Sequence, residues 1–348
     1  MPGIGYRLTS IEPKGQAEMK KIVWSMVTAL AVGGGAPALA ADMAVKAAPV
    51  VVAAPPSPWD IAFGAAGMND YVFRGITQSN HKPSVAAYFE PRFNVNKDFQ
   101  LYAGIAGESI SFANNAAAEI DFYGGARWTI GQFVLDGGLW YYYYPGGRCF
   151  NTTAFGADCI GGGLPNGNVI KKDVSFWEAY FKPTWNVNDA LAIGGNFFYS
   201  PSFLNTGAPG TYVSGTVKYT APANMGLGPF GWYVSGEFGR QFLGTSDAFY
   251  GTTFASPAGG GPFPAGIDYA DYNTWNVGLG LTWKVFTLDL RYSDTNLSKA
   301  DCNAFTSDFT ATANGSFSPI NPTGVGSKWC GSTFIAKLSA DLTLGSLK

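Results

Sequence analysis

A strict alternation of apolar with polar or small residues is the feature that most constrains this chain. It is clearest near the C-terminus, where the apolar positions are Trp275, Val277, Leu279, Leu281 and Trp283. The alternation continues over 286–293 with its parity reversed, which predicts a tight turn at 284–285 between two antiparallel strands. A helix would need apolar residues at i, i+3 and i+4, and neither stretch has that spacing.

The same alternation predicts twelve strands along the chain. They are expected at 59–74, 84–95, 99–111, 118–130, 132–144, 174–187, 190–200, 211–221, 230–243, 271–284, 286–296 and 332–344. The connections between them alternate between mostly short and mostly long. Short turns at one end and long loops at the other are typical of outer-membrane barrels, and an even count returns the C-terminus to the N-terminal side.

Composition narrows the fold class further. Aromatic residues make up 16% of the chain and charged residues only 13%, against a usual value of about 25%. Beyond the N-terminal region no segment has ~18 consecutive apolar residues, which excludes helical membrane spans. We therefore expect an all-β fold, an antiparallel up-and-down transmembrane barrel in the bacterial outer membrane, with alternate residues facing lipid.

The N-terminus carries an export signal. Met19–Lys21 is basic, the run Ile22–Gly35 is apolar, and Ala38-Leu39-Ala40 has the small-x-small pattern that predicts cleavage after Ala40. A membrane anchor over 22–36 is the alternative. We assign 1–40 to an upstream extension and signal peptide, 41–58 to an Ala- and Pro-rich periplasmic leader, and 59–348 to the barrel.

The four cysteines form two pairs that are local in sequence. We predict the disulfides Cys149–Cys159 and Cys302–Cys330, each within one long extracellular loop, although four cysteines allow three connectivities. Zinc is the alternative, but the spacing is wrong and the one histidine, His81, is distant, so we expect no metal site. The last loop is rich in Asn, Thr, Ser and Gly, and we expect it to have little core of its own.

Charged residues on the inward parity are the candidate functional residues, because a charge facing lipid at mid-depth costs about 2–4 kcal/mol. They form either a salt-bridge network or the lining of a water-filled pore. The nine acids exceed the six bases, which predicts weak cation selectivity. The predicted lumen-facing charges are Glu90, Arg92, Glu108, Glu119, Asp121, Arg127, Asp136, Glu178, Lys182, Lys218, Glu237, Asp289, Arg291, Lys337 and Asp341.

Several blocks resemble the TorF-type family of proteobacterial porins. The resemblance is dense over 70–146, patchy to about 200, and architectural beyond that. It rests on Asp70–Ser79, Leu101–Gly104, Glu119–Gly125, Leu135–Gly138 with Trp140–Gly146, and Phe176–Tyr180. It implies an outer-membrane barrel with a porin role and carries over no catalytic residue. The chain departs from the pattern in its longer loops and in the absence of a terminal Phe or Trp.

These observations predict a passive channel for small hydrophilic solutes, in contact with outer-membrane lipid. Removal of 1–40 leaves 18 basic and 22 acidic residues, and a net charge of −4 without a basic patch argues against nucleic acid as a partner. We expect no cofactor and no enzyme activity, since His81 is the only histidine and lies in a loop. The alternatives are a structural or surface-interaction barrel with a plugged lumen, and an outer-membrane hydrolase. The oligomeric state is left open.

Overall fold

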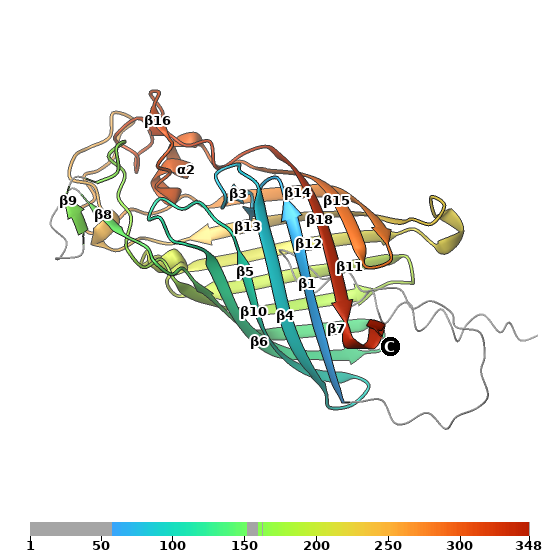
Figure 1. Ribbon diagram of the computed structural model, residues 1–348. Coiled ribbons are helices and arrows are strands. Elements are labelled where there is room, and N and C mark those ends of the chain that lie inside the picture. Colours follow the sequence, from blue (N-terminus) through green and yellow to red (C-terminus); the bar gives the residue numbers. More distant parts are fainter. Residues whose placement is uncertain (1–57, 152–158, 162, 348) are drawn as a thin grey trace, which may run out of the picture.

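The computed structural model describes residues 58–151, 159–161 and 163–347, and within them twelve long strands close into a single antiparallel barrel (Figure 1). The predicted twelve-stranded antiparallel barrel is therefore confirmed. The barrel strands are β1 (Trp59–Met68), β4 (Ser84–Asn94), β5 (Phe99–Glu108), β6 (Glu119–Ile130), β7 (Phe133–Tyr143), β10 (Phe176–Asn186), β11 (Leu191–Ser200), β12 (Gly210–Thr220), β13 (Gly231–Leu243), β14 (Tyr272–Trp283), β15 (Phe286–Thr295) and β18 (Thr333–Thr343).

Each barrel strand pairs with its neighbours in the chain, and the first pairs with the last. β1 meets β18 with Ala65 opposite Ala340, so the sheet has no free edge. The predicted boundaries agree with the observed ones within a few residues, with one larger error at the first strand. We predicted it to run to 74, but β1 ends at Met68, because the chain then turns into the barrel.

Short connections gather at one end of the barrel, which we call the turn end. In two of them an asparagine side chain accepts hydrogen bonds from the backbone N–H groups of the residues two and three positions later in the chain. These residues are Asn96 and Asn188. Gly131 and Lys284 each have a positive φ in tight turns, as two-residue hairpin turns require. The opposite end, with the long connections, is the loop end.

The outer surface of the barrel is apolar. Side chains that alternate along each strand point outward and remain exposed, including Phe89, Leu139, Phe238 and Phe334. Trp128 and Trp185 are exposed on the same face close to the turn end. Among the described residues, no helix is long and apolar enough to span a membrane. The proposed cleavage site at Ala40 and the leader over 41–58 fall almost wholly outside the described residues.

Smaller elements lie mainly at the loop end, where α2 and β16 stand above the barrel in Figure 1. The short strands are β2 (Val72–Phe73), β3 (Ile76–Thr77), β8 (Cys149–Asn151), β9 (Cys159–Gly161), β16 (Thr312–Ala313) and β17 (Val325–Gly326). The helices are α2 (Lys299–Thr306) and the 3₁₀ turns η2 (Phe203–Asn205), η3 (Ala223–Met225), η4 (Ala248–Tyr250) and η5 (Leu344–Leu347). Of these, η3 and η5 lie at the turn end.

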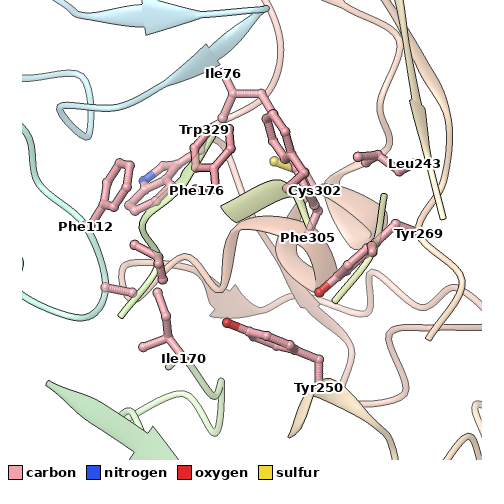
Figure 2. Packing of buried hydrophobic residues seen from close by; sticks show 14 of the residues in the cluster. Ile76, Phe112, Ile170, Phe176, Leu243, Tyr250, Tyr269, Cys302, Phe305 and Trp329 are labelled. Atoms are coloured by element: carbon pink, nitrogen blue, oxygen red, sulfur yellow. The ribbon is translucent and has the colours of Figure 1, made fainter. Parts of the chain in front are cut away.

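The long connections pack on one another and form a hydrophobic core above the barrel. Figure 2 shows Phe112, Ile170, Tyr250, Phe305 and Trp329 converging; Phe305 and Trp329 come from the last connection and the others from three different ones. The last loop, which we expected to have little core of its own, buries Phe305 and Trp329 in a cluster that it shares with the other loops. Burying one such side chain contributes roughly 1.5–3 kcal/mol. We call these packed connections the cap; they are 69–83, 109–118, 144–151, 159–161, 163–175, 201–209, 244–271 and 296–332.

Both predicted disulfides are present in the cap. Cys149 bonds to Cys159 and joins β8 to β9. Cys302 in α2 bonds to Cys330, which lies just before β18. The second bond closes most of the last loop into a ring and holds α2 beside the end of that loop.

Candidate functional site in the barrel lumen

The predicted lumen-facing charges all lie on barrel strands and are buried or half-buried in the structure. Glu108, Lys218, Glu237, Arg291 and Lys337 are half-buried, and the others are buried. They divide between two parts of the lumen that differ in packing.

One part is filled by an ion-pair network across β4, β6 and β7. Arg127 contacts Glu90 at 3.0 Å and Asp136 at 3.2 Å, and Arg92 contacts Glu90 at 2.6 Å. Each of these four side chains is at most 6% exposed. Buried charges are tolerated only when paired in this way, so these residues rigidify the wall of the barrel.

Aromatic side chains complete this packed part. The hydroxyl group of Tyr102 donates to Asp136 at 2.5 Å and contacts that of Tyr180, and its ring lies 3.8 Å from the guanidinium of Arg127. Tyr102 and Tyr180 belong to a buried cluster that also contains Tyr123, Phe198 and Tyr212. These buried side chains fill this part of the lumen.

The other part holds a cavity of about 350 Å³. Charged and polar groups lie among the residues of its walls: Arg291 pairs with Asp289 at 2.9 Å, and the hydroxyl group of Tyr233 donates to Asp289 at 2.7 Å. Lys218 and Lys337 also line it. Residues 70–75, from the first long connection, line the same cavity at the loop end.

A two-residue hairpin turn inside the barrel carries a charge that the sequence interpretation missed. β2 and β3 are joined by Arg74 and Gly75, which have φ values of 48° and 79°, as a turn of this hand requires. A Cβ atom on Gly75 would lie 2.6 Å from Thr274 Oγ1 on β14, so glycine is needed there. We call residues 72–77 the lumen hairpin.

Arg74 fastens the tip of this hairpin to the far side of the barrel. Its guanidinium donates to both carboxylate oxygens of Glu178 on β10, at 2.9 and 2.8 Å, and to Gln241 on β13 at 3.0 Å. The rings of Phe73 and Tyr212 each lie 4.5 Å from it. The hairpin therefore crosses the lumen near the loop end. The Arg-Gly pair between short apolar runs is the sequence signal that could have revealed it.

Three acids gather under the start of the hairpin. Glu108 and Glu119 are directly opposite each other on β5 and β6, and Asp121 follows on the same face. The hydroxyl groups of Tyr71 and Tyr144 donate to the two oxygens of Glu119, at 2.6 and 2.7 Å. These three acids thus cluster on one wall of the lumen, whereas Asp136 belongs to the ion-pair network.

The first long connection is held at its base by Asp70. This buried carboxylate accepts hydrogen bonds from Thr77 and Ser79 and contacts His81 Nδ1 at 2.7 Å. His81 Nε2 lies 3.0 Å from the carbonyl oxygen of Lys328 in the last connection. Two acceptors at the two ring nitrogens favour the imidazolium form. The hydrogen bond to Asp70 is the main cause of a raised pKa of His81, against partial burial, which lowers it.

A family model described as a bacterial protein of unknown function (Gcw_chp) matches residues 52–161. This stretch contains most of the blocks that resemble the TorF-type family, but the match itself does not identify that family. No curated protein sequence matches the chain.

The chain is also similar to solved structures of barrel proteins. An outer membrane channel from Pseudomonas putida F1 is 9% identical, covering 86% of this chain and 100% of that one, with a TM-score of 0.39. The NanC porin is 9% identical, with coverages of 82% and 100% and a TM-score of 0.37. OmpT of Vibrio cholerae is 10% identical, with coverages of 83% and 98% and a TM-score of 0.32. These scores are low, so the fold assignment rests on the strand pairing of this chain.

Proposed function

We propose that the protein is an outer-membrane, porin-like channel for small hydrophilic solutes, and that it is weakly cation-selective. The observation that carries this proposal is the cavity of about 350 Å³ with polar and charged walls inside a closed barrel. A barrel whose only task was structural would gain stability from a fully packed lumen. A cavity of this size with charged side chains on its walls is instead suited to water and small solutes.

The outer surface supports insertion into a membrane. Its exposed apolar side chains alternate with lumen-facing ones along every barrel strand, and the closed sheet satisfies its own backbone hydrogen bonds. In this orientation the turn end is periplasmic and the cap faces the cell exterior. The cap and the lumen hairpin then restrict the path from outside.

A barrel with a plugged lumen is the second candidate, and the lumen hairpin favours it. Arg74 and Glu178 are 5% and 0% exposed, so their ion pair is shielded from solvent. If the hairpin never moves, the long connections become the functional surface. The two candidates differ in conductance, which makes them separable.

Conductance of the purified full-length protein in a planar lipid bilayer tests both. We expect small single-channel currents for the wild type. Arg74→Ala removes the bonds to Glu178 and Gln241, so the hairpin tip is released and the conductance should increase about twofold or more, since a narrow constriction dominates pore resistance.

Arg240→Ala is the matched control. Arg240 lies next to Gln241 on β13 but is 44% exposed and pairs with Asp271 outside the lumen. It should leave the conductance at the wild-type value. If correctly folded wild type and Arg74→Ala both fail to conduct, the channel proposal is wrong and the plugged barrel is favoured.

A further inference from the structure

Three carboxylates at the loop end of β5 and β6 lie close enough to share one ligand. One oxygen each from Glu108, Glu119 and Asp121 can be chosen so that all three lie within 4.8 Å of one another. The strand register produces this arrangement, because Glu108 is opposite Glu119 and Asp121 is two residues further on the same face.

The cluster forms no ion pair among the described residues, although Lys337 on the wall of the same cavity acts electrostatically on Glu108. No basic nitrogen of a described residue lies within 4.0 Å of these carboxylates, and the donors to Glu119 are the neutral hydroxyl groups of Tyr71 and Tyr144. Three ionised carboxylates at this spacing repel one another strongly in a medium of low dielectric constant. The arrangement therefore calls for a bound positive charge or for protonation.

An unsatisfied buried atom points to a ligand independently of the spacing. Asp121 is only 3% exposed, yet its Oδ1 accepts no hydrogen bond, and Oε2 of Glu108 is also buried without a partner. The indole Nε1 of Trp140 lies near Asp121 but outside hydrogen-bonding geometry. Buried polar atoms are rarely left unpaired, so these two oxygens are available to bind a ligand.

We propose that Glu108, Glu119 and Asp121 bind a divalent cation of the calcium type. Calcium binds oxygen ligands at 2.3–2.6 Å, so two ligands across one ion lie at most about 4.6–5.2 Å apart. The three oxygens all lie within 4.8 Å of one another, which is inside that limit. Magnesium demands near-ideal octahedral geometry and loses its water reluctantly, whereas calcium accepts the less regular set of oxygens that two neighbouring strands supply.

The surroundings supply the remaining coordination and a route to the site. Glu108 lines the cavity of about 350 Å³, from which water molecules complete the coordination shell. The ion also links two parts of the fold, since Glu119 is bonded to Tyr71 at the base of the lumen hairpin. Binding at this site does not depend on whether the channel conducts.

Calcium binding to the full-length protein in detergent tests the proposal. Protein treated with EDTA and then dialysed is titrated with CaCl₂ or MgCl₂ by isothermal titration calorimetry. We expect one calcium ion per chain and roughly tenfold or more weaker binding of magnesium, because calcium tolerates irregular oxygen coordination and magnesium does not. This comparison uses the wild type alone, so it does not depend on the folding of a variant.

Two double variants identify the ligands. Glu108→Gln with Asp121→Asn removes two carboxylates and should weaken calcium binding roughly tenfold or more. Asp189→Asn with Asp268→Asn removes the same number of charges from exposed positions and should bind as the wild type does. Absence of calcium binding to the wild type, equal binding of magnesium, or unchanged binding by the folded Glu108/Asp121 variant would overturn the proposal.

Discussion

At the scale of single residues, His81 combines exposure with two specific contacts. Its ring is 41% exposed, yet it bridges the buried carboxylate of Asp70 and the backbone of the last connection. Asp308 also faces it and raises its pKa further. The sequence interpretation treated His81 as a solvated loop residue, because nothing in the local sequence shows that Lys328 lies beside it.

A pH dependence of the cap follows from the raised pKa of His81. A group whose pKa is higher in the folded state stabilises that state fully below its unfolded value of about 6.5, and the stabilisation is lost as the pH rises through the folded-state value. We expect the connection 69–83 to become more sensitive to protease between pH 6 and pH 9. Limited proteolysis followed by mass spectrometry measures this.

His81→Gln is the matching variant, since His81 is the only histidine in the chain. It should remove most of the pH dependence in this range and leave the connection as sensitive at pH 6 as the wild type is at pH 9. An identical pH profile in the variant would show that another group is responsible.

At the scale of elements, the lumen hairpin and the last connection support each other. The N–H group of Thr77 donates to the carbonyl oxygen of Trp329 at 3.0 Å, and Ile76 forms a β-bridge with Cys330. The Cys302–Cys330 disulfide therefore fixes the segment against which the hairpin rests. The last connection and its disulfide are far from the hairpin in sequence. They nevertheless hold the hairpin, and so they fix the position of the charge at its tip.

Removal of this disulfide should loosen the cap while the barrel stays intact. In the loop-entropy model a cross-link across 28 residues contributes about 3–4 kcal/mol to the ordering of the loop. Cys302→Ser with Cys330→Ser should therefore increase protease cleavage over 297–331 and raise the channel conductance. Cys149→Ser with Cys159→Ser should leave cleavage of 297–331 unchanged. Loss of the folded barrel in the first variant would contradict this separation between cap and barrel.

At the scale of the whole molecule, the closed sheet determines the resistance to unfolding. All twelve barrel strands are paired on both sides, so partial unfolding must break the ring. We expect a circular-dichroism spectrum dominated by β-structure and faster migration in cold SDS than after boiling. A helix-rich spectrum, or identical migration under both conditions, would contradict the barrel.

Ion selectivity is also a property of the whole lumen. The predicted lumen-facing charges are nine acids and six bases, and Arg74 adds a seventh base, so the excess of acids falls to two. Three acids that form no ion pair among the described residues lie together on β5 and β6, and screening over about 8 Å keeps their effect modest. We expect a reversal potential of the cation-selective sign across a KCl gradient containing EDTA.

Glu119→Gln with Asp121→Asn should shift this potential toward zero, because it removes two of the three clustered charges. Asp189→Asn with Asp268→Asn, outside the lumen, should leave it unchanged. An anion-selective wild type would refute the proposed selectivity, and an unchanged potential in the Glu119/Asp121 variant would assign these acids a structural role.

The sequence by itself determined the strands, their order and their two faces. Alternation with a period of two is a local property, and it fixes which residues can face lipid, as the stretches 275–283 and 286–293 illustrate. The two disulfides could also be predicted from the sequence, because the two cysteines of each pair lie within one connection. Strand ends followed from short turns with recognisable chemistry, such as those at Asn96 and Asn188.

Only the tertiary structure decided how the lumen and the cap are filled. The insertion of Arg74 between β10 and β13 depends on contacts between residues more than a hundred positions apart. The packing of Phe305 depends on contacts with side chains of other loops. Sequence reasoning about metals considered the spacing of cysteine and histidine, whereas the three clustered carboxylates are brought together by the register of β5 and β6. Periodicity along a strand specifies the face of a side chain, but the neighbours on that face are set by closure of the barrel.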